Sequence, residues 1–166
     1  MKDDLEKMGG RDLLRLYAEV LEALRGRDYV RSANNPVADY AEKLVCAALG
    51  LEPAQKSNKG FDAQDPQTEE RYEVKARRIT SHNKPARFSP LRDFEAQHFD
   101  YFVAVLFESD FSVQRAVKIP WASITDELSS HNAHVNGRVV YVRDSLWTAP
   151  GAVEITKCLQ QAESTF

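Results

Sequence analysis

The stretch at residues 101–107, YFVAVLF, is an unbroken apolar run, and it limits the folds open to this chain more than any other feature. A run of this length without polar alternation indicates a strand that is buried on both faces. Such a strand belongs to a sheet with other elements packed against it, and helical patterns occur upstream. We therefore predict an α/β or α+β fold in which helices flank a mixed central sheet.

Two helices are predicted ahead of the sheet. Residues 11–25, RDLLRLYAEVLEALR, place apolar side chains at helical spacing, which is typical of an amphipathic helix packed on the core or on a partner subunit. Residues 36–49 form the best-delimited element. Asn35 suits the N-cap, Pro36 the first helical position and Gly50 the C-terminal cap.

The remaining elements follow from alternation and from turn signals. Asn136 and Gly137 form a strong turn signal. Residues 79–98 contain two prolines and are expected to form a long loop, and loops of that length are often functional. The other expected elements are strands at 60–63, 72–77, 112–119 and 139–142, an irregular strand within 51–58, a short helix within 121–130, and a short helix in the segment from 151.

The chain has 166 residues, which suffice for one domain with a proper core and are too few for two ordinary domains. We expect a single domain over residues 1–166. The N-terminal helix lies in 1–27, the core in 30–150 and a C-terminal tail in 151–166.

Several classes of protein are disfavoured by composition. No run of residues approaches the apolar length that spans a bilayer, so we expect no membrane partner. The N-terminus, MKDDLEKMGG, is polar and acidic, unlike a secretory signal. Cys46 and Cys158 are too few and too far apart for a disulfide framework or a cysteine zinc site. We therefore expect a reducing, cytoplasmic setting, with Cys46 as a small core residue.

Motifs for other chemistries are missing from the sequence. It contains no P-loop, no dinucleotide fingerprint and no nucleophile elbow, so we expect no organic cofactor. His131 and His134 are three residues apart, but no further ligand accompanies them, and we interpret both as surface residues.

The chemistry concentrates in residues 59–78, KGFDAQDPQTEERYEVKARR. The strand expected at 72–77 alternates with a period of two, so Glu73 and Lys75 share one face. Pairing with the preceding short strand would bring Asp62 to Glu73. Two carboxylates beside an amine suit a hard divalent cation with a charge-stabilising partner. Taken alone, a Glu-x-Lys pattern is also typical of a solvent-exposed strand face.

Glu42 adds a third carboxylate from the helix predicted at 36–49. Its neighbours on one helix face, at positions 38, 45, 46 and 49, are all apolar. A carboxylate in such surroundings is costly unless it finds a partner. Two interpretations remain open: Glu42 bonds to a backbone donor or a lysine, or it faces the same metal site as Asp62 and Glu73.

The charge of the chain is unevenly distributed. The formal net charge of −3 argues against binding of nucleic acid by bulk charge alone. An enzyme that holds carboxylates for a metal can still offer a local basic groove, although a solvated polar surface explains any single one of these residues. The basic residues of the middle segment are Lys56, Lys59, Arg71, Lys75, Arg77, Arg78, Lys84, Arg87 and Arg92.

A helical Glu42, then Asp62 in GFDA, then Glu73 and Lys75 in YEVKARR make a pattern that resembles the PD-(D/E)xK nuclease superfamily, which has the restriction-endonuclease-like fold. The apolar strand followed by a hairpin strand ending in KIP is also similar to small members of that fold. The resemblance covers roughly residues 30–125. Phe61 stands where the family name has proline, at a position that varies in the superfamily.

The resemblance implies specific roles. Asp62 and Glu73 would bind Mg²⁺, with Mn²⁺ as a substitute, and the Val74 carbonyl would be a further ligand. Lys75 would orient or help to deprotonate the attacking water and stabilise charge on the phosphate. Glu42 would hold a second metal or a metal-bound water. Lys56, Lys59, Arg77 and Arg78 flank this site and would hold backbone phosphates.

We therefore expect a metal-dependent nuclease that hydrolyses DNA, with a restriction-endonuclease-like core. A chain this short would need a homodimer to cut both strands symmetrically, and the helix at 11–25 is the candidate interface. Two alternatives stay open: a non-catalytic DNA-binding or assembly module that retains the fold, and a nuclease acting on RNA or on branched or single-stranded DNA.

Overall fold

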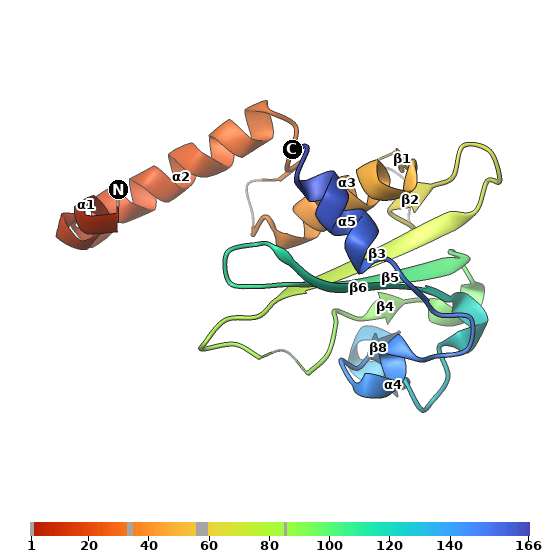
Figure 1. The fold of residues 1–166 in the computed structure, drawn as a ribbon. Coiled ribbons are helices and arrows are strands. Elements are labelled where there is room, and N and C mark those ends of the chain that lie inside the picture. Colours follow the sequence, from red (N-terminus) through yellow and green to blue (C-terminus); the bar gives the residue numbers. More distant parts are fainter. Residues whose placement is uncertain (1, 33–34, 56–59, 85) are drawn as a thin grey trace.

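The computed structural model describes residues 2–32, 35–55, 60–84 and 86–166. Its centre is a six-stranded mixed sheet (Figure 1). β3 and β5 run parallel, and every other neighbouring pair in this sheet is antiparallel. In spatial order the strands are β1 (Glu52–Pro53), β2 (Ala63–Gln64), β3 (Arg71–Arg78), β5 (Tyr101–Phe107), β6 (Val113–Pro120) and β9 (Val153–Glu154).

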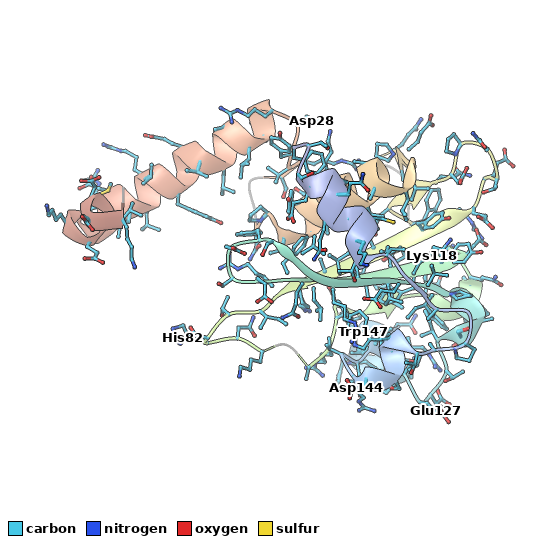
Figure 2. The ribbon with its side chains drawn as sticks, viewed as in Figure 1. Asp28, His82, Lys118, Glu127, Asp144 and Trp147 are labelled. Atoms are coloured by element: carbon cyan, nitrogen blue, oxygen red, sulfur yellow. The ribbon has the colours of Figure 1, made fainter. Side chains whose placement is uncertain are left out.

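One face of this sheet is covered by a smaller, three-stranded sheet, which lies below it in Figure 1. Phe102, Ala104 and Leu106 of β5 point into this layer and are buried there with Phe88 and Leu91. The short helix α4 (Asp144–Trp147) lies on the same side, and Figure 2 labels its Asp144 and Trp147. The strands of the smaller sheet, in spatial order, are β4 (Leu91–Arg92), β8 (Gly137–Val140) and β7 (Ser129–Asn132).

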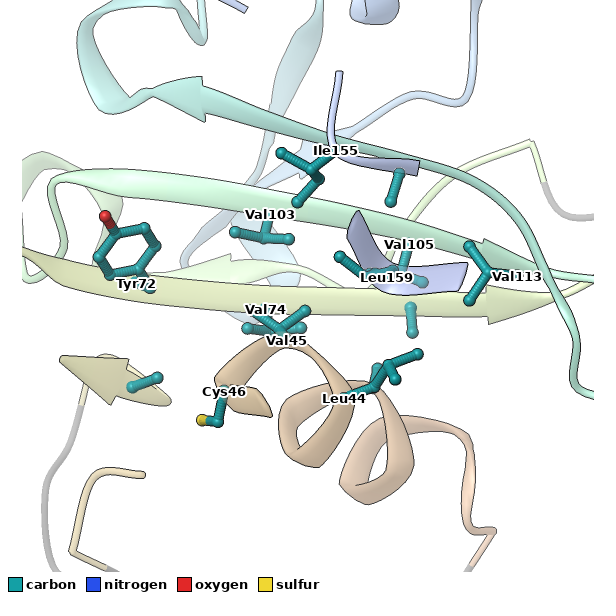
Figure 3. Packing of buried hydrophobic residues seen from close by; sticks show 14 of the residues in the cluster. Leu44, Val45, Cys46, Tyr72, Val74, Val103, Val105, Val113, Ile155 and Leu159 are labelled. Carbon is teal, nitrogen blue, oxygen red and sulfur yellow. The ribbon is translucent and has the colours of Figure 1, made fainter. Parts of the chain in front are cut away.

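The opposite face is covered by two helices, α3 (Val37–Leu49) and α5 (Thr156–Glu163). Val103 and Val105 of β5 point to this side, where Leu44 and Leu159 pack against them (Figure 3). The alternating residues of β5 therefore enter two different cores. This arrangement explains why the sequence of β5 is apolar at every position, and it confirms the prediction of a strand buried on both faces.

The N-terminal helices α1 (Lys2–Lys7) and α2 (Gly10–Gly26) extend away from this layered body (Figure 1). The first part of α2 exposes large apolar side chains, with Leu14 71% and Tyr17 50% accessible. Near its end, Leu21 is buried against the body. In the part of the chain that the structure describes, we find no helix that has both the length and the apolar character needed to cross a bilayer.

Several elements differ from the sequence-based expectations. The predicted start of α3 is one residue too early, because Pro36 takes the N-cap position expected for Asn35 and the helix begins at Val37. The Asn35 side chain still accepts a hydrogen bond from the Val37 amide at 3.1 Å. Within 121–130, the chain makes one 3-10 turn (Trp121–Ser123) and then enters β7 at Ser129. The C-terminal segment is not a loose tail. Leu159 of α5 is fully buried, so this helix forms part of the core.

Candidate active site

The candidate site lies where the pairing between β2 and β3 ends. The two strands pair only at Tyr72 and Arg71 of β3. Asp62 stands just before β2, and its amide donates to the Tyr72 carbonyl at 2.8 Å. Beyond Tyr72, β2 no longer pairs with β3, and the Val74 amide donates its hydrogen bond to Asp62 Oδ2 instead, at 2.8 Å. The backbone of β3 thus fixes the Asp62 side chain.

Lys75 links the two predicted metal-binding carboxylates. Its ammonium lies 3.8 Å from Asp62 Oδ2 and forms a short ion pair with Glu73 Oε1. The same Nζ donates to the Val74 carbonyl at 3.3 Å. All three side chains are largely buried, with exposures of 17% for Lys75, 24% for Asp62 and 14% for Glu73. Three oxygens from the predicted ligands therefore converge on one cation.

Glu42 approaches from α3, on the other face of the sheet. Its side chain is 19% exposed, and its Oε2 lies 3.8 Å from Arg31 Nη1. Burial, followed by the negative charge of Asp62, raises the pKa of Glu42 to about 7, although Arg31 counteracts the shift. Glu42 therefore feels the charge of Asp62, but its ion pair is with Arg31 and it does not line the hollow described below.

The cluster holds three carboxylates and one lysine, so its ionised form carries excess negative charge. Burial raises the pKa of Glu73, Lys75 opposes this shift, and Asp62 adds to it. Burial works against the Lys75 ammonium, but the charges of Asp62 and Glu73 outweigh it and raise the pKa of Lys75. The lysine therefore stays charged, and the carboxylates compete for too little positive charge.

Asp62, Glu73 and the Val74 carbonyl are oxygen donors of the kind that hard divalent cations prefer. Within the described ranges, the structure contains no group of three or more His, Cys, Asp or Glu side chains that could hold a metal ion. Mg²⁺ does not need one, because it keeps several waters and binds proteins through one or two carboxylates. Asp62, Glu73 and the Val74 carbonyl already point at one cation, Lys75 Nζ. A metal at this position would require the Lys75 ammonium to move aside.

A hollow of about 300 Å³ opens over this cluster. It lies on the face of β3 that carries Glu73 and Lys75, opposite α3. A larger hollow of about 760 Å³ lies between α2 and the body, but its lining contains none of the four clustered residues. The residues around the smaller hollow are Gly60, Phe61, Asp62, Glu73, Lys75, Pro90, Leu91, Arg92 and Phe99.

Of the four predicted phosphate-binding residues, the structure describes Arg77 and Arg78, which lie on opposite faces of β3. Arg77 lies on the same face of β3 as Glu73 and Lys75, and its Nε donates to the Arg87 carbonyl at 3.0 Å. Burial, followed by the positive charge of Arg87, lowers the pKa of Arg77. Arg78 points to the opposite face, 4.4 Å from the centre of the Phe111 ring, so the structure does not bring it to the carboxylates. Lys56 and Lys59 lie outside the described residues.

Sequence reasoning missed the wall of the hollow that faces β3. Pro90, Leu91 and Arg92 come from the expected loop, where β4 is only two residues long. Such a short strand leaves no alternation for sequence analysis to find. The SPLRDF stretch around it was the available signal, because its apolar residues interrupt an otherwise polar segment.

No protein-family model matches this chain. No curated protein matches it either.

Proposed function

We propose that this chain is a metal-dependent nuclease with a restriction-endonuclease-like core, which hydrolyses phosphodiester bonds in DNA. The observation that carries the proposal is the convergence of Asp62, Glu73 and the Val74 carbonyl on the Lys75 ammonium. Carboxylates that repel one another are costly to keep together. Binding of a divalent cation offsets this repulsion, so a metal role explains an arrangement that a merely structural role does not.

Each residue has a task in this reaction. Asp62 and Glu73 would hold Mg²⁺ or Mn²⁺, with Glu42 adding negative charge from α3. A bound metal would supply a Lewis acid that activates water and neutralises the phosphate. Once released from the carboxylates, the Lys75 ammonium would stabilise the negative charge that develops on the phosphate oxygens. Hydrolysis adds one water across a P–O bond, leaving a phosphate on one product and a hydroxyl on the other.

The competing function is a DNA-binding or assembly module without activity. Such a module needs surface cations, but it has no physical need for three neighbouring carboxylates. The half-buried Arg77 beside Arg87 serves either function, because both require contacts to backbone phosphates. The carboxylate cluster therefore favours the enzyme.

The test is cleavage of supercoiled plasmid by the purified chain in Mg²⁺, in Mn²⁺ and in EDTA. We expect nicking or linearisation with either metal and none in EDTA. Lys75→Ala should lose cleavage while still binding the metal. If no metal supports cleavage and calorimetry detects no Mg²⁺ binding, the nuclease proposal fails and the binding module replaces it.

A further inference from the structure

The hollow over the carboxylates has two chemically different halves. Asp62, Glu73 and Lys75 form its charged floor on β3 and just before β2. The remaining wall is largely apolar and comes from the segment that follows β3 and from Phe61. Its apolar side chains are Phe61, Pro90, Leu91 and Phe99, and Gly60 and Arg92 complete the lining. A phosphate would contact the charged half, while the partly buried Phe61 and Pro90 leave apolar surface for another part of a ligand.

The apolar half is firmly held. Leu91 is 1% and Phe99 3% exposed, so both belong to the second core. Phe61 is only partly buried and packs against that core. The backbone before it is fixed by Gly60, which has a φ of 117° and lies directly against the His98 side chain. His98 Nε2 is in turn 2.9 Å from Asp93 Oδ2. The backbone before Phe61 is thus held in place, and Phe61 lines the hollow.

Arg92 contributes a second cation to the lining of the hollow, beside Lys75. It extends from β4, which is held close to β8 by Gly137, because a β-carbon at position 137 would lie only 2.7 Å from the Leu91 carbonyl oxygen. Among the described residues, Arg92 forms no ion pair, and its side chain is exposed. Lys75 and Arg92 therefore both line the hollow. Of the two, Arg92 has no carboxylate partner among the described residues.

We propose that this hollow binds a single unpaired nucleotide, with its phosphate between Lys75 and Arg92 and its base against Phe61. The inference rests on the proposed nuclease function and names its substrate as single-stranded DNA or an unpaired stretch within DNA. The hollow of about 300 Å³ is at the small end of ligand pockets, which suits one nucleotide. A base that enters it must leave its stack and its pairing partner.

Stacking of a base on an aromatic ring tolerates any base sequence, because every base has a π-face. The hollow therefore selects for unpaired structure and not for sequence. In the competing arrangement, a duplex lies across the rim of the hollow and only one of its backbone phosphates reaches the carboxylates. In that arrangement Phe61 has no contact with a base, and paired and unpaired DNA bind alike.

The test is fluorescence anisotropy with a labelled single-stranded oligonucleotide and with the same strand annealed to its complement, both in Ca²⁺ without Mg²⁺. We expect the wild-type chain to bind the single strand at least about tenfold more tightly than the duplex. Phe61→Leu should weaken single-strand binding by about 5- to 100-fold, and Phe61→Tyr should retain it. Arg92→Gln should lower the slope of log affinity against log salt by about 0.7. Arg78→Gln, on the opposite face, is the control and should change binding less than Arg92→Gln.

Equal or tighter binding of the duplex by the wild-type chain would overturn the inference, and this comparison needs no variant to fold. Unchanged single-strand binding in a folded Phe61→Leu variant would also overturn it. Cleavage of duplex and single strand at equal rates would leave the nuclease standing and reject the unpaired nucleotide. Binding of the single strand without any cleavage would retain the nucleotide site and reject the nuclease.

Discussion

The carboxylate of Asp62 accepts a hydrogen bond from the backbone amide of Val74, with 2.8 Å between Oδ2 and N. Asp62 therefore has two tasks: it completes the hydrogen bonding of β3 with one oxygen, and it supplies negative charge to the cluster. A substitution that removes the charge and keeps the oxygen can separate these tasks.

Asp62→Asn should retain the hydrogen bond to Val74 and lose metal binding, because its amide oxygen still accepts while its charge is gone. Asp62→Ala should lose both, and leaving the partly buried Val74 amide without its acceptor should cost about 1–3 kcal/mol relative to Asp62→Asn. Urea unfolding in EDTA measures the first effect and Mg²⁺ calorimetry the second. Equal unfolding free energies for the two variants would show that the hydrogen bond does not stabilise β3.

Binding of Mg²⁺ should strengthen as the pH rises through about 7. Burial and the charge of Asp62 raise the pKa of Glu42 to about 7, and burial also raises the pKa of Glu73. A metal must displace any proton from these carboxylates, so its affinity should rise up to about tenfold per pH unit for each proton released. Calorimetry in buffers of different ionisation heat counts those protons. A flat affinity from about pH 6 to about pH 8 without proton release would contradict the prediction.

The same shift predicts how pH affects the stability of the metal-free protein. The pKa of Glu42 rises on folding from 4.5 to about 7, so the folded state holds a proton that the unfolded state has released. Its stabilising contribution is complete below pH 4.5 and is lost as the pH rises through about 7. Unfolding in EDTA should therefore show a pH-dependent loss of stability that Glu42→Gln reduces, while the part that comes from Glu73 remains. An identical pH dependence in wild type and Glu42→Gln would contradict this assignment.

Much of the sheet could be predicted from the sequence because its strands carry strong periodic signals. The apolar run predicted at 101–107 matches the bounds of β5, and the alternation predicted at 72–77 lies within β3. The predicted C-cap at Gly50 is confirmed by its φ of 69°. These features depend on neighbours in sequence, and local patterns record them well.

The smaller sheet could not be predicted in the same way. β4 has two residues and gains its place only through β8, which lies far along the chain. Within the site, Asp62, Glu73 and Lys75 come together as the strand alternation predicted. Arg78 does not join them, because the alternation of β3 places its side chain on the opposite face, where it stacks on the Phe111 ring. The facing wall with Arg92 depends on tertiary packing that leaves no local pattern.

Gly60→Ala should destabilise the protein and disturb the site. The φ of 117° at Gly60 strains any side chain, and a β-carbon would collide with His98. We expect a loss of about 1–3 kcal/mol in unfolding free energy, with weaker binding at the displaced Asp62. Gly26→Ala is the matched control, because nothing lies within 4 Å of its position and it lies in α2. Equal melting temperatures for the two variants would contradict the close packing.

The exposed apolar side chains of α2 should bring two copies of the chain together. Leu14 and Tyr17 are the most exposed of its large apolar side chains, and exposed apolar patches mark contact sites. Light scattering should give the mass of a dimer for the wild-type chain and of a monomer for a Leu14→Glu, Tyr17→Glu double variant. Arg15→Glu also adds negative charge to α2 and should leave the dimer intact. A wild-type monomer at working concentration would contradict the prediction.

The role of Lys75 in cleavage can be measured as the single-turnover cleavage rate of labelled DNA at increasing Mg²⁺ concentration, for wild type, Lys75→Ala and Lys43→Ala. Lys43 is an exposed lysine that pairs with Asp28 and lies outside the carboxylate cluster. We predict that Lys75→Ala cleaves about 100- to 1000-fold more slowly than wild type at saturating metal, while Lys43→Ala keeps the wild-type rate. If Lys75→Ala cleaves as fast as Lys43→Ala, or if wild-type cleavage persists in EDTA, Lys75 and the carboxylates around it do not form a metal-dependent nuclease site.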